Sequence, residues 1–389
     1  MDVYITRHPV FDRNGALFGY VMPYRENDAG TGKALLEADP ESIVGSARAF
    51  VFFDFDMILH GVPRKMSSET LVALVSANMP SHIEIINQLG IMKSGGYLIA
   101  LEDIEDLDEL DDNELLKLCD IAVVDVNAER FAEVAKKCAA LGKQILARNA
   151  ETAEQAERAK SLGASYVQGF FFARFGEGSK REVQPLPVNL VEIMRLMADP
   201  EPEIRSIVEV MSRDTAMCQK ILKLINSVYF GVSNSVSSIN QAILILGLDY
   251  LREWVYLMGM QKLTQNDNTE TIKLALLLAK FCRRLAELIP DVEDKGDTFY
   301  LMGLLSMLVF SGEKSLETQL DEFPLSADIK RGLLRRGGVY SDVLEIALAF
   351  AAGNWERFET LAAAYNLSLP ETGDKLTAAL WEIGELELS

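Results

Sequence analysis

The first half of the chain alternates short apolar, β-branched runs with segments whose apolar positions repeat at helical spacing. Such runs, bounded by turn residues, predict strands. We expect strands at Val3–Thr6, Ala16–Met22, Ala49–Phe55, Thr70–Val75, Tyr97–Leu101, Ile121–Val126, Gln144–Arg148 and Tyr166–Phe170. The last four begin 22 to 24 residues apart, which is the rhythm of strand–loop–helix units in a parallel sheet. Eight strands with intervening helices, one of them at Glu151–Leu162, predict a compact α/β barrel of the (β/α)8 type.

The pattern in the second half is helical throughout. Apolar residues at i, i+3, i+4 and i+7 run from Leu190 to Met197, Asp214 begins a helix that reaches Asn226, and a capping box at Ser238–Gln241 begins another. Further helices are expected at Tyr250–Leu263, Thr271–Ile289, Thr298–Phe310, Ala327–Leu334, Ser341–Ala352 and Glu356–Tyr365. The second half is therefore predicted to be all-α.

A stretch rich in glycine, proline and charge separates the two patterns. We expect a barrel over residues 1–176, a linker over 177–187 and a helical domain over 188–389. At 389 residues, two domains agree with the length of the chain.

The charge of the chain excludes one class of partner. Lys and Arg number 38 and Asp and Glu 58, for a formal net charge of −20. Residues 1–184 hold 19 and 29 of these, so residues 185–389 hold the same numbers. Neither half offers the basic surface that a phosphate backbone needs, which argues against nucleic-acid binding. No apolar stretch is long enough to span a bilayer. Four scattered cysteines and a start without a secretion signal indicate a cytoplasmic protein with reduced thiols.

Two motifs resemble the EAL family of cyclic-di-GMP phosphodiesterases. Gly19-Tyr-Val-Met-Pro-Tyr-Arg25 resembles the first signature of that family, and Tyr166-Val-Gln-Gly-Phe-Phe-Phe-Ala-Arg-Phe175 resembles the last. The resemblance implies a barrel with its site at the C-terminal ends of the strands. It also implies that Val21 occupies the place of a metal-binding glutamate, and that Arg25 matches a residue that meets a substrate phosphate. A salt bridge at a sheet edge is the alternative role for Arg25.

The resemblance also locates the remnants of the site, which are Arg25, Asp54, Glu102, Asp103, Asp125 and Gln168. Asp54 stands where the family has asparagine, and Glu102 and Asp103 stand for a pair of aspartates. The departures are as informative. The fourth strand lacks its glutamate, Val123 replaces a lysine and Arg148 replaces a glutamate. Two Mg²⁺ ions need a double set of oxygen ligands, so we expect no metal, no cofactor and no catalytic residue.

An acidic run follows the fifth strand. Residues 102–114 contain nine acids and no base. A solvated loop and helix start is one interpretation. At the rim of the barrel the run would also repel a ligand that carries two phosphates.

The helical half resembles the HDOD domain of bacterial signalling proteins. The resemblance rests on Leu186–Pro200, Ser212–Met217, Lys220–Ser227 and Ser238–Leu248. It implies the fold of the HD phosphohydrolases without their metal site. All three histidines (His8, His60 and His82) precede residue 83, so the helical half has no histidine to bind a metal. We expect all three to be structural or exposed. Three polar residues are expected as structural markers of the domain: Asp214, Asn226 and Ser227.

The leading hypothesis is a catalytically inactive signalling protein of the EAL-HDOD type that acts through contacts with other signalling proteins. A homodimer is a further possibility. The alternative is a non-hydrolytic receptor that is switched by c-di-GMP at the degenerate barrel site. An active phosphodiesterase, which would need an unorthodox site on Asp54, Glu102, Asp103 and Asp125, is the third hypothesis.

Overall fold

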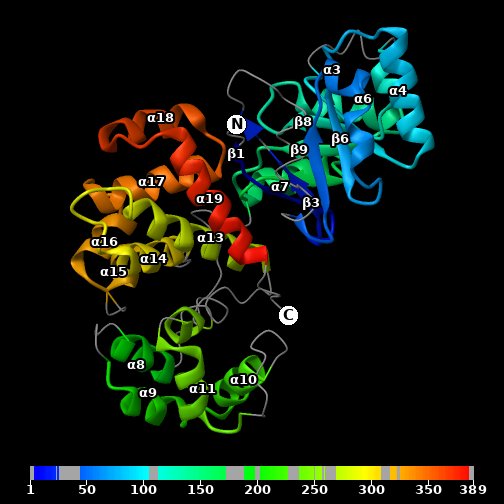
Figure 1. The fold of residues 1–389 in the computed structure, drawn as a ribbon. Coiled ribbons are helices and arrows are strands. Elements are labelled where there is room, and N and C mark those ends of the chain that lie inside the picture. Colours follow the sequence, from blue (N-terminus) through cyan, green and yellow to red (C-terminus); the bar gives the residue numbers. More distant parts are fainter. Residues whose placement is uncertain are drawn as a thin grey trace.

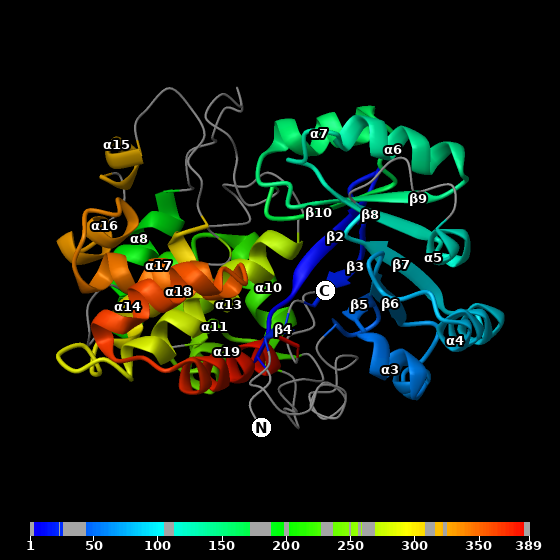
Figure 2. The ribbon, with the colours of Figure 1, turned by 90° about the horizontal axis from the view of Figure 1, so that it is seen from above.

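The protein consists of a barrel followed by helices, seen in a computed structural model (Figures 1 and 2). The structure describes residues 4–22, 24–25, 44–104, 113–171, 188–197, 202–226, 236–248, 250–255, 258, 269–307, 316–321 and 325–384. Of the sequence-based predictions, the linker at 177–187, most of the acidic run and Ser227 lie outside these residues.

Eight strands close into a barrel in the order β10-β2-β3-β5-β6-β7-β8-β9. They are β2 (His8–Asp12), β3 (Leu17–Val21), β5 (Arg48–Phe52), β6 (Leu71–Ser76), β7 (Leu98–Glu102), β8 (Ile121–Asp125), β9 (Gln144–Arg148) and β10 (Tyr166–Gln168). The barrel strands other than β2 run parallel to one another, as their spacing in the sequence indicates. The expected fold class, a closed α/β barrel followed by an all-α part, is confirmed.

The first barrel strand is not the one predicted. Tyr4–Ile5 (β1) pairs with Tyr24–Arg25 (β4) in a separate two-stranded sheet. The barrel strand is β2, which runs antiparallel to both of its neighbours. The sequence pattern conceals it because β2 is buried on both sides and therefore shows no alternation. Pro9 near its start adds to the ambiguity, although a proline there is tolerated.

The barrel interior is filled with apolar side chains from successive strands. They are Val10, Phe50, Val72, Leu74, Ala100, Ile121, Val123 and Leu146. Val123, which the resemblance to the EAL family places at the position of a lysine, is 5% exposed in this inner core. The barrel is therefore a packed core, and only its ends can hold a site.

Helices cover the outside of the barrel. They are α3 (Phe55–Leu59), η1 (Val62–Lys65), α4 (Ile83–Ser94), α5 (Glu114–Leu118), α6 (Phe131–Ala140) and α7 (Ala153–Ser161). The helix expected at Glu151–Leu162 is α7, which Thr152 and Gln155 begin with a capping box. A larger apolar core fills the space between the strands and these helices.

The second part is helical throughout its described residues. Its helices are α8 (Val188–Met197), α9 (Ile204–Met211), α10 (Thr215–Ile225), α11 (Ile239–Leu246), α13 (Thr269–Ala286), α14 (Gly296–Leu305), α15 (Leu316–Leu320), α16 (Ala327–Leu333), α17 (Val339–Ala351), α18 (Trp355–Ala362), η3 (Ala363–Tyr365) and α19 (Leu369–Gly384). Three of these, α9, α15 and α19, are absent from the sequence-based predictions. Figure 1 shows α8 to α11 gathered below the group formed by α13 to α19.

The central helix α13 contacts both α14 and the barrel. Gly303 of α14 approaches it so closely that a Cβ there would lie 2.4 Å from the carbonyl oxygen of Leu278. Phe11 of β2 packs into the helical core, which makes the apolar contact between the two parts continuous. Among the described residues, no helix has the length and apolar character needed to cross a membrane.

Candidate functional site

Polar side chains gather where β6, β7, β8, β9 and β10 end, the end at which barrels of this kind carry their sites. An ion pair joins Glu102, the last residue of β7, to Arg148, the last residue of β9. Oε2 of Glu102 lies 2.6 Å from Nη1 of Arg148. Burial raises the pKa of Glu102, and the neighbouring Arg148 opposes the shift. The arginine that replaces an acid is thus the partner of a remaining acid.

Asp103 is held from the neighbouring strand. Ser76, the last residue of β6, donates a hydrogen bond to Oδ2 of Asp103 at 2.8 Å. The backbone of Asp103 has φ of 59°, a left-handed conformation that non-glycine residues rarely adopt. The end of β6 therefore supplies a hydroxyl donor to the carboxylate of Asp103.

Asp125, at the end of β8, accepts two hydrogen bonds. Its Oδ1 accepts from the backbone N–H of Asn127 at 2.8 Å, and its Oδ2 accepts from Nδ2 of Asn149 at 2.6 Å. Asn149 follows β9 and has φ of 62°. The carboxylate thus ties the loop after β8 to the loop after β9.

Asp54 serves as a helix cap. Its Oδ1 accepts from the backbone N–H of Met57 at 2.8 Å, so the side chain satisfies the first turn of α3. Arg25 contributes backbone pairing to β4, and its side chain lies outside the described structure.

Gln168 and Gly169, the retained residues of the last signature, have structural partners. The buried amide of Gln168 accepts from the backbone N–H of Asn149 at 3.0 Å and donates to Nδ1 of His8 at 3.1 Å. Gly169 has φ of 141°, and a Cβ there would lie 2.2 Å from the carbonyl oxygen of Ala150. Packing within this chain therefore accounts for both residues.

His8 extends this chain of hydrogen bonds into the helical part. Its Nε2 lies 3.2 Å from the carbonyl oxygen of Ala351, at the end of α17, and donates to it. Nδ1 is then the acceptor for Gln168, which requires a neutral ring. Burial lowers the pKa of His8 to about 4, and the bond to Ala351 opposes this shift. His8 is structural, and it is the first residue of β2.

The donor set at the rim does not fit two Mg²⁺ ions. Glu102 faces a guanidinium, Asp125 faces an amide N–H₂ group, and Val21 at the end of β3 has no oxygen to offer. Within the described residues, no three His, Cys, Asp or Glu side chains come together as a metal site would require. We therefore derive no metal-dependent reaction step from this arrangement.

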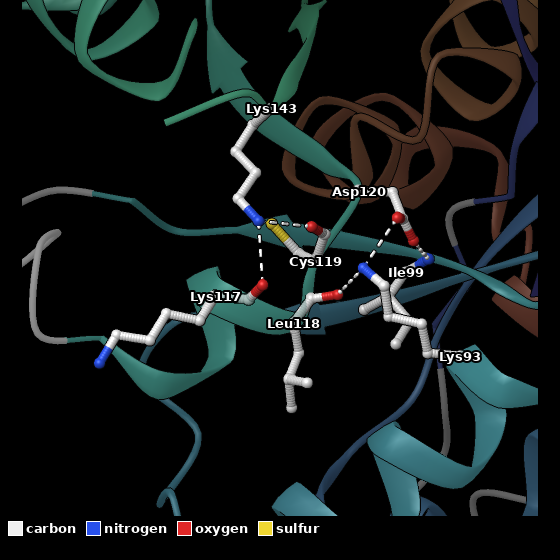
Figure 3. A network of polar contacts seen from close by, with 7 residues as sticks. All are labelled: Lys93, Ile99, Lys117, Leu118, Cys119, Asp120 and Lys143. Atoms are coloured by element: carbon white, nitrogen blue, oxygen red, sulfur yellow. Dashed lines mark hydrogen bonds and ion pairs between the residues drawn. The ribbon is translucent and has the colours of Figure 1, made fainter. Parts of the chain in front are cut away.

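The opposite end of the barrel holds a separate polar network (Figure 3). Lys93 donates to Leu118 O and Asp120, and Lys143 donates to Lys117 O and Cys119 O. These lysines satisfy the last carbonyls of α5. Burial raises the pKa of Cys119 to about 12, which disfavours the reactive thiolate. The network stabilises the fold.

Asp214 and Asn226 occupy the two ends of α10. Asp214 accepts from the backbone N–H of Met217 at 3.0 Å as an N-cap. The amide of Asn226 donates to Leu222 O and Val236 O, both at 2.8 Å, and accepts from Val236 N–H at 2.7 Å. It thereby links Val236, in the segment before α11, to the end of α10.

The comparisons with known proteins agree with this architecture. Residues 183–309 match the HDOD domain family. The chain thus carries an HDOD domain after a barrel that resembles the EAL fold, and the expected resemblance to EAL-HDOD signalling proteins is confirmed.

Two relatives match along nearly their whole length. The chain is 24% identical over 379 residues to the uncharacterized protein YuxH of Bacillus subtilis, covering 92% of each chain. It is 23% identical over 396 residues to the cyclic di-GMP phosphodiesterase CdgJ of Vibrio cholerae, covering 97% of this chain and 91% of the relative. Among solved structures, the EAL domain of Mycobacterium smegmatis DcpA is similar at 16% identity, over 44% of this chain and 92% of that chain, with a TM-score of 0.37.

Sequence reasoning identified the acids at the rim and missed their partners. Arg148 was interpreted only as a lost acid, and Ser76 and Asn149 received no role. His8 was expected to be structural or exposed, but without a named partner. One signal was available in the sequence. An arginine that stands at a strand end in place of a glutamate can pair with a carboxylate at the end of another strand. The contact between His8 and Ala351 spans 343 residues and has no signal in a single sequence.

Proposed function

We propose that this chain is a catalytically inactive relative of c-di-GMP phosphodiesterases that regulates signalling through contacts with other proteins. One observation carries the proposal, namely that the rim acids Glu102, Asp103 and Asp125 are each engaged by a hydrogen-bond donor from the same chain. A metal would have to displace the guanidinium of Arg148 to reach Glu102. Two-metal hydrolysis also needs ligands that stabilise both the attacking and the leaving oxygen, and Val21 and Arg148 supply none.

Incubation of the full chain with c-di-GMP and Mg²⁺ or Mn²⁺ tests the proposal, with chromatography to detect the linear product. We expect no product above the rate without protein, while the relative CdgJ, named a c-di-GMP phosphodiesterase, serves as the positive control. Hydrolysis that disappears in Asp103→Asn would establish the active phosphodiesterase and overturn the proposal.

A c-di-GMP receptor without hydrolysis is the second candidate. It is favoured by Arg25, which stands where the related enzymes have a phosphate-binding arginine. It is opposed by Gln168, whose amide is already committed to Asn149 and His8. Calorimetry with c-di-GMP, with and without Mg²⁺, separates the two functions. Saturable heat that Arg25→Ala removes and that Arg130→Ala leaves unchanged would establish the receptor. No heat at high micromolar ligand supports a protein that acts by contact alone.

A further inference from the structure

A cavity of about 430 Å³ lies between the barrel and the helices α13 to α17. Leucine is the commonest residue in its walls, which include Leu274, Leu278, Leu305, Leu333, Leu344 and Leu348 beside several polar side chains. Glu151 and Phe170 close it from the barrel side. The volume lies within the range of small-molecule sites, and apolar walls of this kind favour an aliphatic chain over a polar ligand.

Arg335 lines the same cavity and occupies an unusual place in the fold. It follows the last turn of α16 with φ of 51°. Its N–H donates to Gly332 O, and the N–H of Arg336 donates to Arg331 O, which together form the helix-ending turn that strongly favours glycine at this position. An arginine is less stable there than a glycine. The backbone conformation therefore does not explain why an arginine occupies position 335.

The remaining charges of the lining leave Arg335 available to an anion. Arg357 donates to Glu345, so these two charges neutralise each other. Glu151 lies on the barrel side, among the residues that follow β9. An anionic head group is therefore directed to the end of the cavity where Arg335 lies. The formal charge of −20 on the chain also disfavours unspecific anion binding elsewhere.

From these observations we propose that the cavity binds a straight-chain aliphatic carboxylate, with its chain between the leucines and its carboxylate on the guanidinium of Arg335. The site goes beyond the function proposed above and does not involve the barrel rim. It does adjoin the contact between the two parts of the chain. The ring of Phe170 lies 5.1 Å from that of His8, whose Nε2 donates to Ala351, and Ala351 lines the cavity as well.

Calorimetry of the full chain with decanoate, below its micelle concentration, tests the proposal. We expect saturable one-to-one binding. Leu348→Trp, which places a large ring in the cavity from a partly exposed position, should abolish it, whereas Leu141→Trp on the exposed barrel surface should not. Arg335→Gly should weaken decanoate binding about tenfold, the size of a charge-assisted contact. The same substitution should leave the melting temperature unchanged or raise it, because glycine suits the left-handed turn.

Two results overturn the proposal. One is the absence of saturable binding by the unsubstituted protein. The other is decanoate binding that Arg335→Gly leaves unchanged, since the carboxylate then has another partner or none. Methyl decanoate, which has no charge, provides the matched ligand. Its affinity should not respond to Arg335→Gly, and an equal loss for both ligands would show that the variant damages the cavity instead of removing a charge.

Discussion

Glu102 and Arg148 form an ion pair 2.6 Å long that joins the ends of β7 and β9 across β8. The pair is electrically neutral, and each charge has its partner within the chain. The resemblance to the EAL family places an acid at the position of Arg148, so under the proposed function the arginine stands in for a metal ligand.

The two members of this ion pair should respond differently to substitution. Arg148→Ala leaves a carboxylate that is 14% exposed without its cation, and we expect a loss of about 1–2 kcal/mol in the free energy of unfolding at pH 7. The estimate is modest because the Arg148 side chain is 36% exposed and its charge is screened. Glu102→Gln should cost less, because burial raises the pKa of Glu102 and so already disfavours its charged form.

Urea denaturation of the two single variants and of the double variant measures the coupling between the residues. Equal losses in both single variants, adding fully in the double variant, would show that the pair does not interact in solution.

The helical caps and the inner strands could be predicted because their signals are local. Asp214 stands directly before an amphipathic stripe, and β7 to β10 follow one another at regular spacing. The strand β2 could not be predicted in this way. Its burial on both sides depends on packing against the helical part, where Phe11 joins the helical core. The same limit applies to the site. The acids were identifiable from motifs, while the role of Gln168 depends on His8, which lies 160 residues away.

Acid should weaken the link through His8. The ring is neutral in the fold with its pKa lowered to about 4, whereas the unfolded chain has the ordinary value of 6.5. Between these pH values the unfolded state binds a proton that the folded state does not bind. The free energy of unfolding therefore falls as pH drops from 6.5 towards 4. The shift corresponds to about 3 kcal/mol over that window. Protonation would also place an N–H on Nδ1 opposite the amide donor of Gln168.

His8→Gln isolates this contribution, since glutamine stays neutral and can both donate and accept. Melting temperatures from pH 7.5 to pH 4.5 should fall less steeply for His8→Gln than for the unsubstituted chain. His60→Gln, at an exposed histidine, is the control and should leave the slope unchanged. Identical slopes for all three proteins would mean that carboxylates alone cause the acid sensitivity.

Tyr20 fastens the barrel to the first turn of α13. Its hydroxyl donates to Oε2 of the buried Glu270 at 2.7 Å, and Lys273 pairs with the other oxygen of that carboxylate at 2.9 Å. Burial raises the pKa of Tyr20, so the hydroxyl remains a donor at all ordinary pH values. Tyr20→Phe removes a hydrogen bond to a buried charge and should cost about 1.5–3 kcal/mol.

Tyr166→Phe is the matched control for this variant. The Tyr166 hydroxyl makes a 3.5 Å contact with Gln144 at the exposed surface, and its ring stacks on Phe18 in either form. Its free energy of unfolding should change by less than about 0.5 kcal/mol. A loss in Tyr20→Phe no larger than in Tyr166→Phe would mean that the contact with Glu270 does not hold the two parts together.

Two glycines within helices should respond to alanine with opposite signs. At Gly303 a Cβ would lie 2.4 Å from Leu278 O and 2.8 Å from Ala279 Cα, both in the backbone of α13. Backbone atoms cannot change rotamer as a side chain can, so α14 must move away from α13. We therefore expect Gly303→Ala to lower the free energy of unfolding by about 2–3 kcal/mol. Gly90 lies within α4 with nothing within 4 Å of its Cβ position, so Gly90→Ala should gain about 1 kcal/mol from helix propensity alone. Thermal denaturation of both variants decides the matter, and a stabilising Gly303→Ala would contradict the close crossing of α13 and α14.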